Sequence, residues 1–156
     1  MENTGAFVCG LLALILAIVD IFIPTYNLSI LVSLLMLGIV IAINAGILLL
    51  LGGIWSSKNL GGAGFGTGMG GWGLIIGISI YGIMWNQQRL AMAAVQDAVA
   101  LIISIIFMDP FYYIMFAPYT TSYRIGLTGS IVDLCLMLGA MILGIISFSL
   151  DASKGI

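Results

Sequence analysis

Residues 61–85 read GGAGFGTGMGGWGLIIGISIYGIMW and lie near the middle of the 156-residue chain, between two long apolar runs. In a soluble protein, such a glycine-rich stretch would form a flexible loop. Between segments apolar enough for a bilayer, it favours a helix whose backbone approaches a neighbouring helix closely. Glycines that recur mostly at four-residue spacing predict one bare helix face for packing, made of Gly62, Gly66, Gly70, Gly73 and Gly77.

The composition of the whole chain indicates an integral membrane protein. Hydrophobic residues make up 62% of the chain and charged residues 6%, and the mean hydropathy is +1.27. Soluble domains contain about 25% charged residues, so this chain lacks the polar groups to cover a surface in water. Because no polar segment is long enough to fold separately, residues 1–156 are expected to form a single transmembrane domain.

Polar and proline-containing breaks divide the chain into apolar segments, which predict an all-α protein with about five transmembrane helices. The predicted spans are residues 7–24, 28–55, 64–85, 90–108 and 126–150. The third, glycine-rich span is expected to begin irregularly, and the polar residues 86–89 are expected to form a turn. Aromatic residues around 111–116 predict a short helix at the membrane interface. Five crossings would place the two termini on opposite sides, and the four basic residues divide equally between them, so they give no orientation.

Several function classes are excluded by what the chain lacks. With only four Lys and Arg residues, it has no clustered basic surface for nucleic acid. The absence of histidine excludes bis-histidine haem, histidine-based metal sites and Ser-His-Asp catalysis. We therefore expect no cofactor, metal or catalytic site, and the ligand expected from the composition is bound lipid.

Polar residues within the predicted spans are the other candidates for function, because they are costly in a bilayer. They are Asp20, Asn44, Asp97 and Asp133. Asp20 lies near Pro24, where its carboxylate could reach the lipid headgroups. Asn44 is placed to form an interhelical hydrogen bond. For Asp97 and Asp133, structural hydrogen bonding and proton or ion handling are both open.

The sequence favours a non-catalytic accessory subunit or scaffold of a larger membrane protein complex. Its small-residue helix faces suit docking to helices of other subunits, so a hetero-oligomer is expected and a homo-oligomer is possible. The alternative is a small homo-oligomeric proton or ion channel or transporter that uses Asp97 and Asp133. The protein is expected to be multi-pass, in a membrane that the sequence does not identify.

Overall fold

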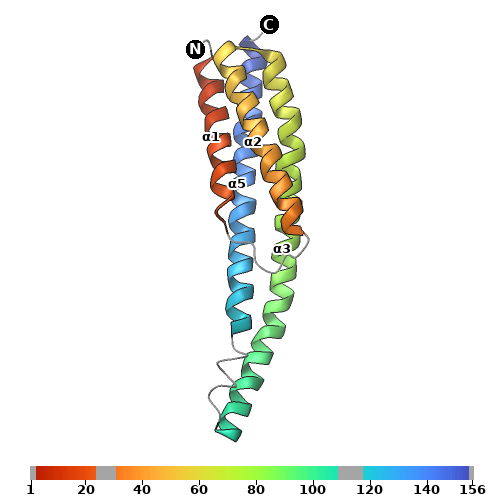
Figure 1. The fold of residues 1–156 in the computed structure, drawn as a ribbon. Coiled ribbons are helices and arrows are strands. Elements are labelled where there is room, and N and C mark those ends of the chain that lie inside the picture. Colours follow the sequence, from red (N-terminus) through yellow and green to blue (C-terminus); the bar gives the residue numbers. More distant parts are fainter. Residues whose placement is uncertain (1–2, 24–30, 109–117, 155–156) are drawn as a thin grey trace.

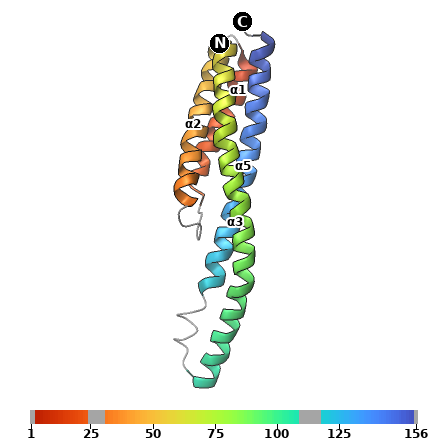
Figure 2. The ribbon, with the colours of Figure 1, turned by 90° about the vertical axis from the view of Figure 1, so that its right-hand side faces the viewer.

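The computed structural model describes residues 3–23, 31–108 and 118–154. These residues form four helices, which are α1 (Thr4–Asp20), α2 (Leu31–Trp55), α3 (Lys58–Phe107) and α5 (Pro118–Lys154). Along one part of the molecule all four helices lie side by side, and beyond it α3 and α5 continue as a pair (Figures 1 and 2). The fold is thus a four-helix bundle with a two-helix extension.

Local capping explains where the helices begin and end. The side chain of Asn3 accepts a hydrogen bond from the Ala6 amide at the start of α1, and Ser57 does the same for the Leu60 amide at the start of α3. These acceptors satisfy amides that have no partner in the first turn. Met108 ends α3 in the left-handed conformation, at φ 54°. The glycine-rich segment is therefore helical from Lys58 onward, and the expected irregular start is absent.

The predicted turn at residues 86–89 is wrong, because α3 continues through it. The Asn86 amide donates to the Gly82 carbonyl at 2.7 Å, and the Arg89 guanidinium lies over the Trp85 ring at 4.3 Å from its centroid. Glutamine and arginine are good helix formers, and the segment contains neither glycine nor proline. Polarity alone therefore did not end the helix, and the predicted third and fourth helices are one.

The extension has its own buried seam on α3. The small or polar buried residues there are spaced by seven, seven and four positions, and they are Asn86, Ala93, Ala100 and Ser104. Such spacing keeps one face of a helix against a neighbour. At ~1.5 Å per residue, α3 is ~75 Å long, against a bilayer core of ~30 Å.

The remaining helix boundaries agree with the prediction for α1 and α2 but not for the start of α5. The helices α1 and α2 fall close to the predicted spans 7–24 and 28–55, whereas α5 begins at Pro118 rather than near residue 126. Proline suits the first position of a helix, where its missing N–H has no partner to lose. The predicted interfacial aromatic segment, 111–116, lies outside the described residues.

Small residues allow the four helices to pack closely. The core contains alanines from α1, α2 and α5, and its largest fully buried side chain is Trp72 of α3. The Trp72 ring fills the space above Gly68 and Gly144, where an added Cβ would overlap it. A single large ring is thus seated between two glycines on neighbouring helices.

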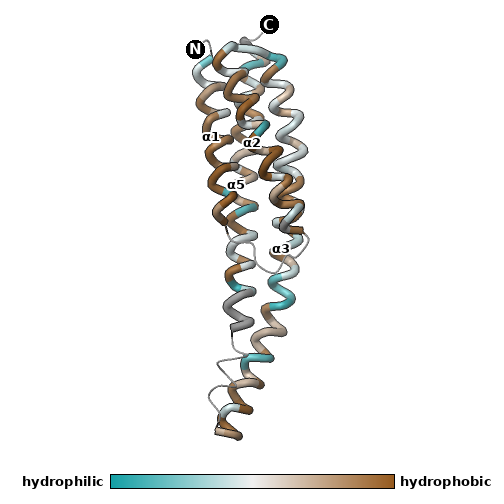
Figure 3. The backbone as a smooth tube through the Cα atoms, viewed as in Figure 1, coloured by the Kyte–Doolittle hydropathy of each residue, from teal (hydrophilic) through white to brown (hydrophobic). Residues whose placement is uncertain are grey.

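Among the described residues, three helices are long and apolar enough to cross a membrane by length and composition, within Ser33–Trp55, Lys58–Phe107 and Tyr123–Ser153. The shorter α1 is also apolar. In Figure 3, α1 and α2 are strongly hydrophobic, whereas the part of α3 beside them is paler. Both termini lie at the same end of the bundle (Figure 1), which corrects the prediction of opposite sides, because the predicted third and fourth helices are one.

Candidate functional site

The outer face of α3 carries a row of open glycines. A Cβ added at Gly66, Gly70, Gly73 or Gly77 would meet no heavy atom within 4 Å. At ~100° per residue these four positions fall within an arc of ~60°. We call them the outer glycine stripe. They are four of the five residues predicted as a packing face, and no part of the chain that the structure describes covers them.

The fifth predicted residue, Gly62, lies at the edge of the stripe. A Cβ there would be 3.5 Å from Cε2 of Phe148, and the Phe148 ring stacks on Phe65 with centroids 5.0 Å apart. Gly62 therefore borders the contact between α3 and α5 and is not part of the open face.

A second row of glycines lies on the opposite side of the same helix. We call Gly61, Gly64, Gly68 and Gly71 the inner glycine stripe, and all four are buried. A Cβ at Gly64 would lie 2.9 Å from the Leu49 amide nitrogen, and one at Gly71 would lie 2.8 Å from that of Ala42. At Gly64 and Gly71 the inner stripe is thus already in contact with the backbone of α2. The sequence analysis did not select the inner stripe, because the glycines of both rows recur at similar three- and four-residue intervals and spacing alone does not tell which row is buried.

Asn44 lies on the outward side of α2, where its side chain is exposed. Its neighbours on that side are apolar and exposed as well, among them Val40 and Ile47. The described hydrogen bonds include none to the Asn44 side chain, so the expected interhelical bond is not made within the described part of this chain. An amide among apolar side chains is costly toward lipid and favourable toward another helix.

The structure brings Asp20 of α1 and Asp133 of α5 together. Each side chain is only 1% exposed, and the two carboxyl groups are close enough to hydrogen-bond to each other. Both oxygens of Asp20 and Oδ1 of Asp133 are buried without a donor among the described residues. The Asp20 side chain is thus buried against α5, and its expected reach toward lipid headgroups stays a prediction. We call these two residues the carboxyl pair.

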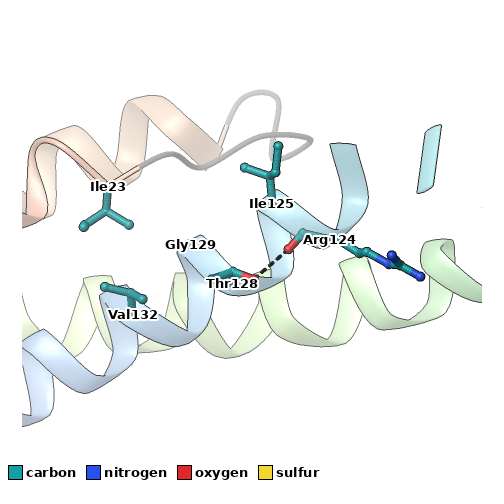
Figure 4. A pocket seen from close by; sticks show the side chains of 6 residues that line it. All are labelled: Ile23, Arg124, Ile125, Thr128, Gly129 and Val132. Carbon is teal, nitrogen blue, oxygen red and sulfur yellow. Dashed lines mark hydrogen bonds between the residues drawn. The ribbon is translucent and has the colours of Figure 1, made fainter. Parts of the chain in front are cut away.

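A cavity of about 280 Å³ lies between the end of α1 and the first turns of α5, and neither Asp20 nor Asp133 lines it. Its lining includes Ile23, three residues after Asp20, and Gly129 and Val132, which flank Ser130 and Asp133. In Figure 4 the Arg124 side chain extends away from Ile23 and Val132. The Thr128 hydroxyl donates to the Arg124 carbonyl at 2.9 Å. The cavity is thus largely apolar near the pair, with a basic side chain at its far edge.

A second polar cluster lies at the opposite end of the bundle, where Asn3 meets the last turns of α5. Asn3 donates from Nδ2 to the Leu150 carbonyl at 3.0 Å and to Oδ1 of Asp151 at 3.3 Å. The Ser147 hydroxyl donates to the Ala6 carbonyl at 2.8 Å. The carboxylate of Asp151 also approaches Gly52 and Gly61, where an added Cβ would lie 2.9 Å and 2.6 Å from its Oδ2.

The sequence analysis missed this cluster. Asn3 precedes an apolar helix and so has the position of an N-cap, which was the available signal. Nothing local indicates its partner, which lies 148 residues away.

Asp97 is half-buried on the extension of α3 and is not brought to Asp133. The register of α3 and α5 places these two carboxylates more than ~20 Å apart along the helix axes. In the described residues, no group of three or more His, Cys, Asp or Glu side chains is arranged to hold a metal ion. No family model, curated protein or solved structure matches this chain.

Proposed function

We propose that this protein is a non-catalytic, multi-pass subunit of a larger membrane protein complex, and that the outer glycine stripe of α3 binds a transmembrane helix of another subunit. The observation that carries this proposal is the open space over Gly66, Gly70, Gly73 and Gly77. A helix backbone can approach this face as closely as α2 approaches the inner stripe.

Glycine on this face does not stabilise the isolated chain. Glycine lowers helix stability by about 1 kcal/mol relative to alanine in helix interiors. It also presents little side-chain surface to lipid. In a bilayer, where apolar side chains gain little by leaving lipid, close backbone contact is a main source of helix association. A row of four outward glycines therefore supports a partner helix.

Two further surfaces support a partner. The exposed Asn44 side chain on α2 would find hydrogen-bonding groups on another helix. At the end of the α3 extension, Ile105 is 68% exposed, Ile106 66% and Phe107 73%. Contiguous exposed apolar surface of this kind is typical of interaction sites.

In this proposal the bilayer surrounds the four-helix part of the molecule. The capping residues Asn3 and Ser57 then lie near one face, and the end of α1 at Asp20 lies near the other. Because α3 is one continuous helix, it crosses the bilayer once. Its length of ~75 Å is more than twice the bilayer core of ~30 Å, so much of it lies outside the core. The chain would cross four times, and the extension would project from the membrane.

The alternative function, ion transport through Asp97 and Asp133, is less well supported by the geometry. The structure pairs Asp133 with Asp20 and leaves Asp97 on the extension. A path through both Asp97 and Asp133 would have to run more than ~20 Å along the α3–α5 contact.

The proposal is tested by placing large side chains on the outer stripe. We expect the double variant Gly66→Leu/Gly70→Leu to fold but to lose its partner subunits at least tenfold when it is purified from its own membrane in mild detergent. Ser149→Leu, at an exposed position on α5, is the matched control and should keep them. Unchanged co-purification of the partners with the double variant would contradict the proposal.

A further inference from the structure

The contact between Asp20 and Asp133 lacks a hydrogen-bond donor. Both side chains are 1% exposed, and their carboxyl groups lie within hydrogen-bonding reach of each other. An ionised carboxylate only accepts hydrogen bonds, and two adjacent buried negative charges repel. We propose that Asp20 and Asp133 form a buried proton-binding site, in which one protonated carboxyl donates to the other carboxylate and thereby holds α1 against α5.

Ser130 provides an independent reason to regard this place as a binding site. It lies one turn before Asp133 on the same buried face of α5, it is 1% exposed, and its hydroxyl has no partner. A hydroxyl can donate to the ionised member of the pair once a proton occupies the other. Ser130 thus leaves one unpaired buried donor within one helical turn of Asp133.

A second unpartnered hydroxyl lies at the same level on α3. The α3–α5 register is given by Gly61 beside Asp151, Phe65 beside Phe148 and Trp72 beside Gly144. Continued along both helices, it places Ser79 opposite residues 133–137. Ser79 is 1% exposed and its hydroxyl has no partner. Three helices thus contribute polar groups at the level of the carboxyl pair.

No described basic side chain neutralises the pair. Residues 31–55 of α2 contain no titratable side chain. On α3, Tyr81 is exposed and stacks on Trp85, and the Arg89 guanidinium lies over the ring of the same tryptophan. On α5, Arg124 is exposed and lines the far edge of the cavity, where its side chain extends away from Ile23 and Val132 (Figure 4). On α1, the other titratable side chain is Cys9, about three turns away.

A cavity lies near the pair, although neither carboxyl lines it. It is lined by Ile23, Gly129 and Val132, within about one helical turn of Asp20, Ser130 and Asp133. Water that reaches the pair would exchange one proton with it. Release of that proton leaves two carboxylates in contact and loosens α1 from α5, whereas uptake restores the hydrogen bond.

Infrared difference spectroscopy of the full chain in lipid vesicles tests the site directly. At neutral pH we expect the carbonyl band of a protonated carboxylic acid, which shifts in D₂O and disappears as the pH is raised. Asp20→Asn and Asp133→Asn should each remove this band, because an asparagine amide can donate to the remaining carboxylate without a proton. Asp97→Asn, on the extension, should leave it intact.

Thermal unfolding measured against pH provides a second readout. Since the native pair holds a proton that two unfolded aspartates do not hold at neutral pH, stability should fall as the pH rises. In Asp20→Asn/Asp133→Asn, two amides can pair without a proton, so this part of the pH dependence should vanish. A carbonyl band that survives in both single variants would overturn the proposal. So would loss of the wild-type band on adding sodium or calcium chloride at fixed pH, because that result would identify a metal-cation site.

Discussion

The two glycine stripes of α3 have the same composition and lie on the same helix, but they have opposite surroundings. The inner stripe faces the core, where added Cβ atoms at Gly64 and Gly71 would lie under 3.0 Å from α2. The outer stripe lies about 180° away, and added Cβ atoms at Gly66 and Gly70 would meet nothing. One stripe shows what such a surface does when its partner is present. The other has the same geometry, with no partner helix among the described residues.

The largest expected effect is on folding and comes from the inner stripe. Gly71→Leu would force a branched side chain into the backbone of α2, which lies 2.8 Å from the added Cβ. Overpacking of this kind costs up to ~3 kcal/mol, or more when the backbone cannot move. We expect loss of the folded bundle, measured by circular dichroism and gel filtration in detergent. Gly70→Leu, one residue away, should fold normally, and equal melting temperatures for the two variants would contradict the comparison.

Alanine substitutions in the two stripes should change the free energy of unfolding in opposite directions. Gly71→Ala should destabilise the chain by ~1–3 kcal/mol, because one methyl group already overlaps α2. Gly70→Ala should stabilise the isolated chain by ~0.5–1 kcal/mol through helix propensity. Both values can be measured by reversible unfolding in detergent. A loss of stability in Gly70→Ala would show that the outer stripe is already occupied within this chain.

The smallest expected effect is at Asn44. Asn44→Leu removes an exposed amide from an apolar face and leaves the packing of this chain unchanged. If the amide bonds to a partner helix, its loss weakens association by ~0.5–2 kcal/mol. Quantitative co-purification against wild type measures this change. Stronger association of the leucine variant would contradict the proposed role.

Much of this architecture could be predicted from the sequence, because it depends on hydropathy and short-range spacing. Long apolar segments predicted helices that could cross a membrane. The spacing of Gly66, Gly70, Gly73 and Gly77 predicted that these glycines lie on one helix face. The error at residues 86–89 arose because polar residues were interpreted as a turn. A turn requires residues that break a helix, and glutamine and arginine do not.

The contacts between distant residues could not be predicted. The carboxyl pair joins residues 20 and 133, and the terminal cluster joins residues 3 and 151. Each of these contacts depends on helix order and register, which no local pattern encodes. The error at residues 86–89 added to the difficulty, because an extra turn reverses the direction of every later helix. The four-helix order brings α1 beside α5, and with it Asp20 beside Asp133.

Native mass spectrometry of the protein extracted in mild detergent from its own membrane tests the central claim most directly. The account predicts a complex of this chain with different polypeptides at fixed stoichiometry, and the same analysis of Gly66→Leu/Gly70→Leu should show the chain alone. A wild-type chain that appears alone, or only as copies of itself, would contradict the claim that the outer glycine stripe binds another subunit.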